Sequence, residues 1–257
     1  MSSTVAVAVR GSGPLAELLR RQISGRADLA FTPNDRRTAA GAAADVLIYL
    51  PDQAALNRKA GAVTKPVIGW LTDGIDVVST LPASLFDREK LRGACRAGGT
   101  TFHGSGGLSA VLPVRFSRAF AAITRDIESV SVLEHRQPAG PDAARAVCTE
   151  AAAALLAEAA FGRIDSAATS GGRTAEYAVR DDADRQIPVR YEVQTVTPEA
   201  TGRCTIEFHG VDRSAAILAQ ELLDVIVPVH ISAPGILHHE LDINQVELDD
   251  RLARRSR

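Results

Sequence analysis

The stretch Thr4-Val-Ala-Val-Ala-Val-Arg10-Gly-Ser-Gly-Pro14 decides the fold of this 257-residue chain. Its first seven residues are almost wholly apolar and rich in valine, which is typical of a strand buried on both faces. Apolar residues then recur at helical spacing from Leu15 to Ile23, and Pro14 suits a first helical turn because its missing N–H needs no partner there. The chain therefore opens with a buried strand, a glycine turn and a helix.

Strands and helices continue to alternate after this opening. We expect short strands at residues 29–31, 45–50, 76–80 and 100–103, a helix at residues 87–97, and a continuation of the third strand region at residues 65–69. Strands that alternate with helices predict a parallel, doubly wound sheet. The fold class is thus α/β, with a Rossmann-type domain over residues 1–125.

The pattern changes near residue 126. An alternating strand at residues 127–136 and an alanine-rich helix at 148–161 precede strands at 175–180, 189–197 and 204–211, which follow one another without helices. A helix at residues 214–226 and a last strand at 228–232 complete the set. We predict an α+β mixed-sheet domain over residues 126–227 for substrate binding and oligomerisation, with residues 228–257 packing back on the first domain.

Composition excludes several classes of function. The formal net charge is −2, so the chain has no global basic field for nucleic acid. No window of 18 apolar residues suggests a membrane span, and the first residues do not form a secretory signal. The three cysteines are too widely spaced for a disulfide framework or a zinc site, and Cys95 is expected in the core. We expect a cytoplasmic protein without nucleic-acid or membrane partners.

The glycine turn suggests a nucleotide. Gly11-x-Gly13-x-x-Ala16 lies between a strand and a helix, where small residues let the backbone approach a pyrophosphate and the helix offers free N–H groups. An ordinary tight turn would give the same pattern. Arg36 and Arg37 follow the second strand, where arginines favour the 2′-phosphate of NADP, although Asp35 beside them would favour NAD and a solvated loop is equally compatible.

Three further segments resemble one family. They are Asp73-Gly-x-Asp-Val-Val-Ser-Thr80, Ala94-Cys-Arg-Ala-Gly-Gly-Thr-Thr-Phe-His-Gly-Ser-Gly106 and Val227-Pro-Val-His-Ile-Ser-Ala-Pro-Gly-Ile236. Together they resemble the dihydrodipicolinate reductase-like NAD(P)-dependent dehydrogenases, and within them the subgroup of 2,4-diaminopentanoate dehydrogenases and native amine dehydrogenases. The chain looks like a shortened and divergent relative.

The resemblance implies a Rossmann domain with a mixed-sheet domain, NADP(H) or NAD(H) as cofactor, and a homodimer or higher oligomer. It also implies that the reaction takes place between the carboxyl edge of the first sheet and the start of the second domain. The implied cofactor contacts are Gly11, Ser12, Gly13, Pro14, Pro51, Thr80, Gly104 and Gly106.

The sequence also departs from this family. The turn at residues 104–109 lacks the family's Asn-Pro-Gly, and residues 134–143 hold one histidine, no lysine and no Ser-Gly-Thr loop. Leu81 and Pro82 stand where some amine-dehydrogenating relatives place an acid. A second interpretation therefore stays open, namely a non-catalytic or regulatory homologue that keeps the fold.

Hydride transfer needs a proton donor besides the cofactor, and the chain has no lysine after Lys90. Glu134, His135 and Arg136 are the first titratable cluster of the second domain and are our candidate catalytic residues. Ordinary charges at an exposed strand end are the alternative. Because strand side chains alternate, Glu134 and Arg136 share one face and His135 takes the other. His103, just before the glycine turn at residues 104–107, is a further candidate, although it could equally be a structural histidine at a strand end.

The resemblance, together with the glycine turn, implies an oxidoreductase that transfers a hydride between NAD(P)H and a small imine, amine or carbonyl compound. The histidines at 238 and 239 have no third spaced ligand, so no metal is expected. We expect dimerisation through the second sheet, by a face that carries Tyr191, Val193 and Thr195 or their neighbours.

Overall fold

A computed structural model describes residues 4–33, 44–51, 60–105, 126–136, 156, 173–181, 189–208 and 211–237. The chain divides into two units, one of residues 1–105 with 215–257 and one of residues 106–214. Residues 215–227, which the sequence pattern assigns to the second domain, contribute Ala219, Leu222 and Ile226 to a core of the first unit. Each unit is described by itself.

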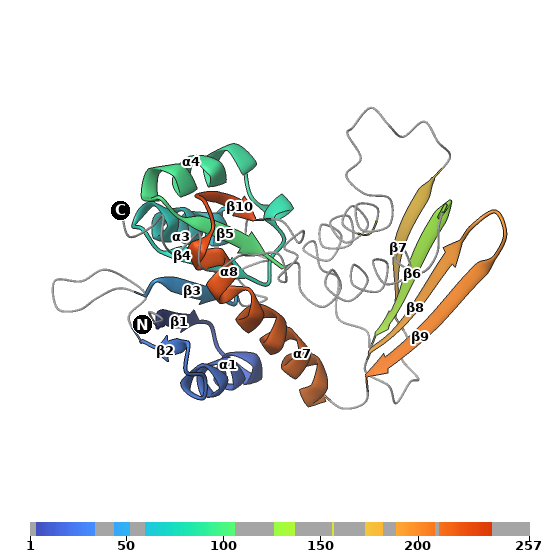
Figure 1. Ribbon diagram of the computed structural model, residues 1–257, viewed down its shortest axis with the longest axis horizontal. Coiled ribbons are helices and arrows are strands. Elements are labelled where there is room, and N and C mark those ends of the chain that lie inside the picture. The colour runs from blue at the N-terminus through green and yellow to red at the C-terminus, as the bar shows by residue number, and fades with distance from the viewer. Residues whose placement is uncertain are drawn as a thin grey trace. The chain divides into compact units, whose positions relative to one another are not determined.

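The first unit is built on a six-stranded sheet in which every pairing is parallel. The strand order is β10-β5-β4-β3-β1-β2, so β1 lies between β2 and β3 (Figure 1). The strands are β1 (Val5–Arg10), β2 (Leu29–Phe31), β3 (Val46–Tyr49), β4 (Asp76–Ser79), β5 (Thr101–Gly104) and β10 (Gly235–Leu237).

Helices cover both faces of this sheet, which explains why its strands are apolar along their whole length. One core joins the sheet to α1 (Pro14–Ser24), α7 (Val211–Asp224) and α8 (Ile226–Ile231). The other core joins it to α3 (Ala60–Thr72) and α4 (Arg88–Gly98), and includes Trp70 and Phe102. The expected α/β fold with a Rossmann-type sheet is confirmed.

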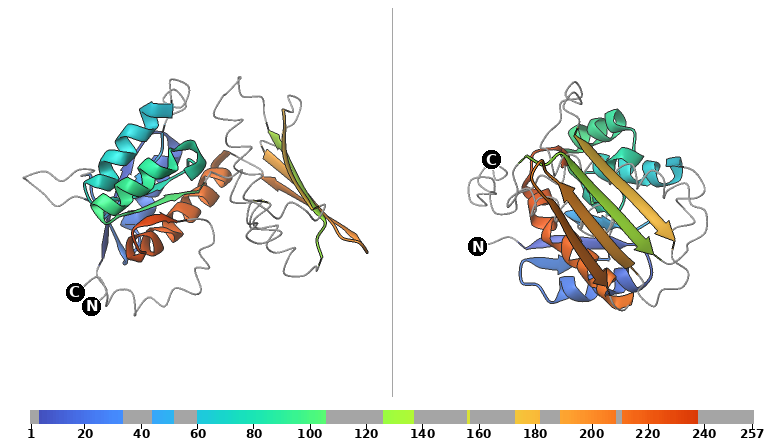
Figure 2. Two further views of the ribbon diagram at one scale, coloured as in Figure 1. Left: turned by 90° about the horizontal axis from the view of Figure 1, so that it is seen from above. Right: turned by 90° about the vertical axis from the view of Figure 1, so that its right-hand side faces the viewer.

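The second unit contains a mixed four-stranded sheet of order β7-β6-β8-β9 (Figure 2). The strands are β6 (Ser129–Arg136), β7 (Thr174–Asp181), β8 (Val189–Val196) and β9 (Thr201–Phe208). The β6–β7 pairing is parallel and the other two pairings are antiparallel. Burial alternates along β8, where Tyr191, Val193 and Thr195 are buried and the residues between them are partly exposed. One face of this sheet is therefore covered within the chain.

Two expectations about local structure are wrong. Residues 65–69 lie inside α3, because Val63, Val67, Trp70 and Leu71 form a buried stripe at helical spacing. Residues 228–232 lie largely in α8 rather than in a strand. Pro228 is compatible with this helix because it lies in the first turn.

Three smaller points complete the comparison with the expected elements. The last strand of the first sheet is β10, and β9 covers residues 201–208 instead of 204–211. The expected helix at 148–161 lies outside the described residues except for Leu156. Among the helices of the described ranges, none is long and apolar enough to cross a membrane.

Candidate functional site

The glycine turn after β1 combines two different requirements. Gly11 has a φ of 150°, and a Cβ atom there would lie 2.6 Å from the carbonyl oxygen of Leu50, so this glycine lets the turn pack against the end of β3. Gly13 has a φ of 88°, and a Cβ atom there would meet nothing within 4 Å. Gly13 is therefore required by its backbone conformation, while the space beside it is open.

The turn leads directly into α1. Gly13 is the N-cap residue of this helix and Pro14 follows it, so the first N–H groups of the helix have no side-chain cap from Gly13. The Arg20 guanidinium donates hydrogen bonds to the carbonyl oxygens of Gly11, at 2.9 Å, and Val9, at 3.2 Å, which holds the turn from the helix side. A rigid turn and a helix N-terminus together favour an anionic ligand.

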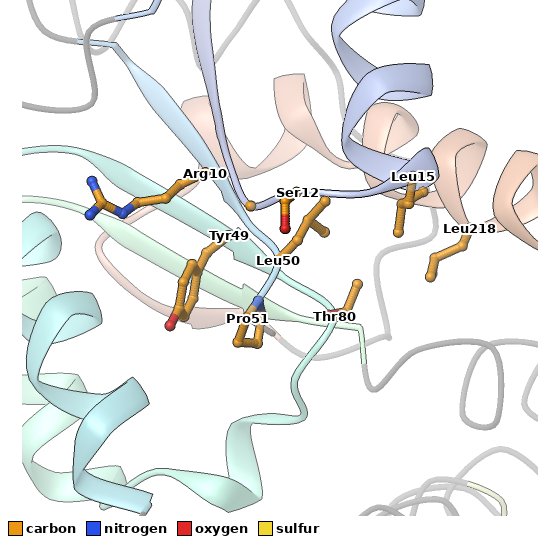
Figure 3. A pocket seen from close by; sticks show the side chains of 9 residues that line it. Arg10, Ser12, Leu15, Tyr49, Leu50, Pro51, Thr80 and Leu218 are labelled. Atoms are coloured by element: carbon orange, nitrogen blue, oxygen red, sulfur yellow. The ribbon is translucent and has the colours of Figure 1, made fainter. Parts of the chain in front are cut away.

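A cavity of about 410 Å³ lies at this turn (Figure 3). Its size is in the usual range for small-molecule sites. The residues that line it are Arg10, Gly11, Ser12, Leu15, Tyr49, Leu50, Pro51, Thr80 and Leu218. Figure 3 shows Leu15 and Leu218 at one end and Arg10 with Tyr49 at the other. The cavity thus has an apolar end and an end that is cationic and aromatic.

The position of the cavity follows from the topology of the sheet. From β1 the chain goes to β2 on one side and then to β3 on the other, so the strand order reverses at β1. In open α/β sheets, ligands bind outside the carboxyl ends of the strands at such a switch point. Ser12, Pro51 and Thr80 follow the carboxyl ends of β1, β3 and β4, and the cavity lies among them.

Hydrogen bonds tie these strand ends together. The Ser79 hydroxyl donates to the carbonyl oxygen of Tyr49 at 3.1 Å and accepts from the Leu81 N–H at 3.1 Å. The Ser105 N–H donates to the carbonyl oxygen of Ser79 at 2.8 Å. The carboxyl ends of β3, β4 and β5 are therefore cross-linked, which makes this edge of the sheet a rigid support.

The structure brings together four of the expected cofactor contacts, Gly11, Ser12, Pro51 and Thr80, around one cavity, with Gly13 and Pro14 in the adjoining turn. Gly104 has a packing role, because a Cβ atom there would lie 2.4 Å from the carbonyl oxygen of Leu81. Arg36, Arg37 and Gly106 lie outside the described residues.

Five lining residues are absent from the sequence-based set: Arg10, Leu15, Tyr49, Leu50 and Leu218. Arg10 and Tyr49 end β1 and β3, so the rule that ligands bind at carboxyl strand ends could have found them. Leu218 belongs to α7, about 200 residues along the chain from the turn, and no local pattern connects it to the cavity.

His103 lies within the first sheet and not at the cavity. It is buried in β5, between Val78 of β4 and Leu237 of β10. Its neighbour Phe102 faces the core with α3 and α4, so strand alternation places His103 on the opposite face. Cys95 is fully buried in α4, as expected of a core residue, and burial raises the pKa of its thiol to about 11.

Glu134 and His135 lie in β6 of the second unit and are both buried, on opposite faces of the sheet. The Tyr177 hydroxyl donates a hydrogen bond to the Glu134 carboxylate. The His135 Nε2 atom lies 3.4 Å from Glu192 Oε1, and the same oxygen pairs with Arg190 Nη2 at 2.6 Å. Arg136 ends β6, and its side chain lies outside the description. Glu134 and His135 therefore have different polar neighbours, on opposite faces of the sheet.

No family model matches the sequence, and no curated protein matches it. Solved structures do. An amine dehydrogenase from Mycobacterium smegmatis matches with a TM-score of 0.60 and 11% identity over 91% of this chain and 95% of that one. An engineered D-amino acid dehydrogenase bound to NADP+ matches with a TM-score of 0.54 and 15% identity over 98% and 99%. Dipicolinate-bound dihydrodipicolinate reductase from Paenisporosarcina matches with a TM-score of 0.50 and 10% identity over 91% and 97%.

The chain has the dihydrodipicolinate reductase-like two-domain fold. The resemblance carried by the sequence motifs is confirmed at this level, and the low identities agree with a divergent chain. In this reductase-like fold, the Rossmann sheet and the mixed sheet correspond to the two sheets described above.

Proposed function

We propose that this protein is an NAD(P)H-dependent oxidoreductase that transfers a hydride between the nicotinamide ring and a small imine, amine or carbonyl compound. The observation that carries the proposal is the cavity among the glycine turn, Pro51 and Thr80 at the switch point of the sheet. The likeness to a dehydrogenase solved with NADP+ supports the same cofactor class.

The described residues fit such a cofactor. The turn at Gly11–Gly13 and the start of α1 would hold the pyrophosphate, because Gly13 leaves open space and the first helical N–H groups are uncapped. Pro51 and Thr80 would border the rest of the dinucleotide. Gly104 and Gly106 are proposed near the nicotinamide, and Arg36 with Arg37 near the adenosine 2′-phosphate, which favours NADP over NAD.

When bound, the nicotinamide donates or accepts the hydride. The chain must then orient the substrate and supply or remove a proton. We propose that Glu134, His135 or Arg136 does this, with His103 as the next candidate. Glu134 has Tyr177 as a hydrogen-bond donor, which orients its carboxylate, and the His135 Nε2 atom lies 3.4 Å from a Glu192 carboxylate oxygen.

Direct binding tests the cofactor. Purified protein is titrated with NADPH and with NADH while nicotinamide fluorescence is recorded, and we expect saturable binding, tighter for NADPH. If neither nucleotide binds, the proposal is wrong. A panel of small ketones and aldehydes, each with and without ammonia, then separates carbonyl from imine reduction by the oxidation of NADPH.

Single alanine variants test the proton donor. Loss of a positioned proton donor typically reduces turnover by about 10²- to 10⁴-fold. We expect this from at least one of Glu134→Ala, His135→Ala and Arg136→Ala, with NADPH affinity nearly unchanged. Full turnover by all three would move the role to His103, which His103→Gln then tests.

A non-catalytic homologue is the second candidate function. It is favoured by the burial of Glu134 and His135, of which only 3% and 4% is exposed, since a proton donor must reach its substrate. Such a protein would bind the nucleotide with normal affinity and show no turnover on any member of the panel. The two measurements above therefore separate the candidates.

We also propose a cytoplasmic homodimer formed through the second sheet. Tyr191, Val193 and Thr195 are already buried within the chain, so the face left for a second copy is the one carrying their neighbours. By register and alternation, that face holds Arg180, Arg190, Arg203, Glu176, Glu192 and Glu207. Equal numbers of both signs suit a face that meets its own copy. Sedimentation should give twice the chain mass of 27.2 kDa, and a monomer at micromolar concentration would contradict the proposed dimer.

A further inference from the structure

Arg10 is the last residue of β1 and has an exposed side chain at the cavity. Its register partner in β3 is Tyr49, so the two side chains lie next to each other on the same face of the sheet. This face is the one covered by α3, since Ala8, two residues earlier on β1, belongs to the core that contains Trp70. Arg10 thus lies at the opposite end of the cavity from Leu15 of α1 (Figure 3).

Two aromatic rings support the guanidinium. Its central carbon lies 5.5 Å from the centroid of the Trp70 ring, within the distance of a cation–π contact. Trp70 is in turn packed edge-on against Tyr49, with ring centroids 5.1 Å apart, and both rings are buried. A guanidinium held over an aromatic face is oriented in advance, and its N–H groups remain suited to forked hydrogen bonds with a phosphate.

Arg10 is also the charged member of the nine described residues that line the cavity. The other arginine close to the turn, Arg20, already donates to the carbonyl oxygens of Gly11 and Val9. Among the described residues that line the cavity, Arg10 therefore brings the positive side chain.

We infer that Arg10 binds a phosphate group of the dinucleotide and is a determinant of its affinity. The inference rests on the proposed function, and it assigns to a residue ahead of the glycine turn a role that the motif itself does not include. The phosphate is either part of the pyrophosphate bridge or the 2′-phosphate of NADP. Both present the same oxygen acceptors to the guanidinium.

Calorimetric titration of wild type, Arg10→Met and Arg10→Lys with NADPH and NADH tests the inference. Calorimetry is chosen because a change at Arg10 also changes the surroundings of Trp70. Loss of a charged hydrogen-bond partner should weaken binding by about 10- to 100-fold in Arg10→Met. Arg10→Lys keeps the charge without the planar fork, so its loss should be smaller. Arg92→Met removes an equally positive but remote, half-exposed side chain and should leave both affinities unchanged.

The two nucleotides distinguish the sources of the phosphate. Equal loss for NADPH and NADH assigns Arg10 to the pyrophosphate, and loss for NADPH alone assigns it to the 2′-phosphate; both results support the inference. Unchanged affinity of Arg10→Met and Arg10→Lys for the two nucleotides overturns it, while wild-type binding leaves the proposed function standing. If wild type binds neither nucleotide, the proposed function and the inference both fail.

Discussion

The buried polar side chains lie at different positions along the strands in the two sheets of this chain. In the first sheet, the buried polar groups lie mostly at strand ends, as with Asp76, Ser79 and Thr101. In the second sheet they lie within the strands, where Glu134 is bonded by Tyr177 on the covered face and His135 lies beside Glu192 on the other. A sheet covered by helices on both faces places most of its buried polar groups at the strand ends, whereas a sheet with one covered face can carry them along its strands.

This contrast suggests that the two units have different roles in the protein. In the first sheet, a cavity lies beside the glycine turn and the carboxyl ends of the strands, and such a site suits the binding of a cofactor. The second sheet offers paired titratable side chains, which suit either proton transfer or contact with another copy of the chain. Changes placed in each sheet should accordingly affect different measurements.

The largest effect is expected in the glycine turn. Gly13→Asp should weaken NADPH binding by about 100-fold or more, because its carboxylate would point into the open space beside the turn and repel the phosphates. Gly13→Asn is the matched control, since it has the same backbone strain at a φ of 88° without the charge. Fluorescence titration measures both. Equal binding by Asp and Asn variants would show that this turn does not hold the anionic part of the ligand.

The next effect concerns the division of the chain. Leu222→Ala, in α7, should destabilise the first unit by about 2–5 kcal/mol because the side chain is fully buried in its core. The only tryptophan of the chain, Trp70, lies in that unit, so urea unfolding followed by its fluorescence reports the loss. Val193→Ala, in the core face of the second sheet, should leave the Trp70 transition in place and shift the tyrosine signal. A Trp70 transition indifferent to Leu222→Ala would contradict the assignment of α7.

A smaller effect is expected from the polar pair of the second sheet. Tyr177→Phe removes the donor to the buried Glu134 carboxylate and should cost about 1–3 kcal/mol of unfolding free energy. Glu134→Gln and the double variant complete a cycle, which should give a coupling energy of about 0.5–3 kcal/mol. Urea unfolding monitored by circular dichroism provides the values. Additive effects would mean that the two side chains do not act as a pair.

The smallest effect is expected away from both sheets. Asp87 caps α4 by accepting hydrogen bonds from the backbone N–H groups of Lys90, at 3.2 Å, and Glu89, at 3.1 Å. The Lys90 N–H, followed by the Lys90 side chain, lowers the pKa of this carboxyl. A lowered folded-state pKa gives stability that is present at neutral pH and is lost as the pH falls through that pKa. Asp87→Ala should therefore lower the Tm slightly at neutral pH and not in strong acid, whereas Asp87→Asn should keep the cap at both.

Much of the fold was accessible from the sequence because its signals are local. The valine-rich strand before Gly11 and the capped helix after Asp87 each depend on a few neighbouring residues. The wrong predictions concern short segments whose apolar residues fit the spacing of a strand and of a helix equally well. Residues 65–69 taken alone have the composition of a strand, but with Val63 and Trp70 on either side they continue a helical stripe. The short helix α8 was missed because it contains Pro228.

The candidate site was accessible only in part, for a different physical reason. The glycine turn and the residues Pro51 and Thr80 follow apolar strands, so their meeting at one edge could be foreseen. Arg10 and Tyr49 form a cluster only through strand register and through Trp70 of α3, a helix whose residues 65–69 we expected to continue a strand region. Such a cluster depends on tertiary packing, and no spacing of residues in the sequence predicts it.

The last three elements of the described chain give the protein a particular order of assembly. Leu223, Ile226 and Val229 lie in the core that also holds β1 and α1, and β10 pairs with β5 at the edge of the sheet. During synthesis the amino-terminal strands leave the ribosome more than 100 residues before these partners exist. The second unit can become compact while the first still exposes one apolar face, although domains nearer the amino terminus usually fold first. A chain that ended at about residue 214 would hold the whole second unit and lack most of the segment that completes the first core, so the later unit could fold while the earlier one still exposed apolar surface.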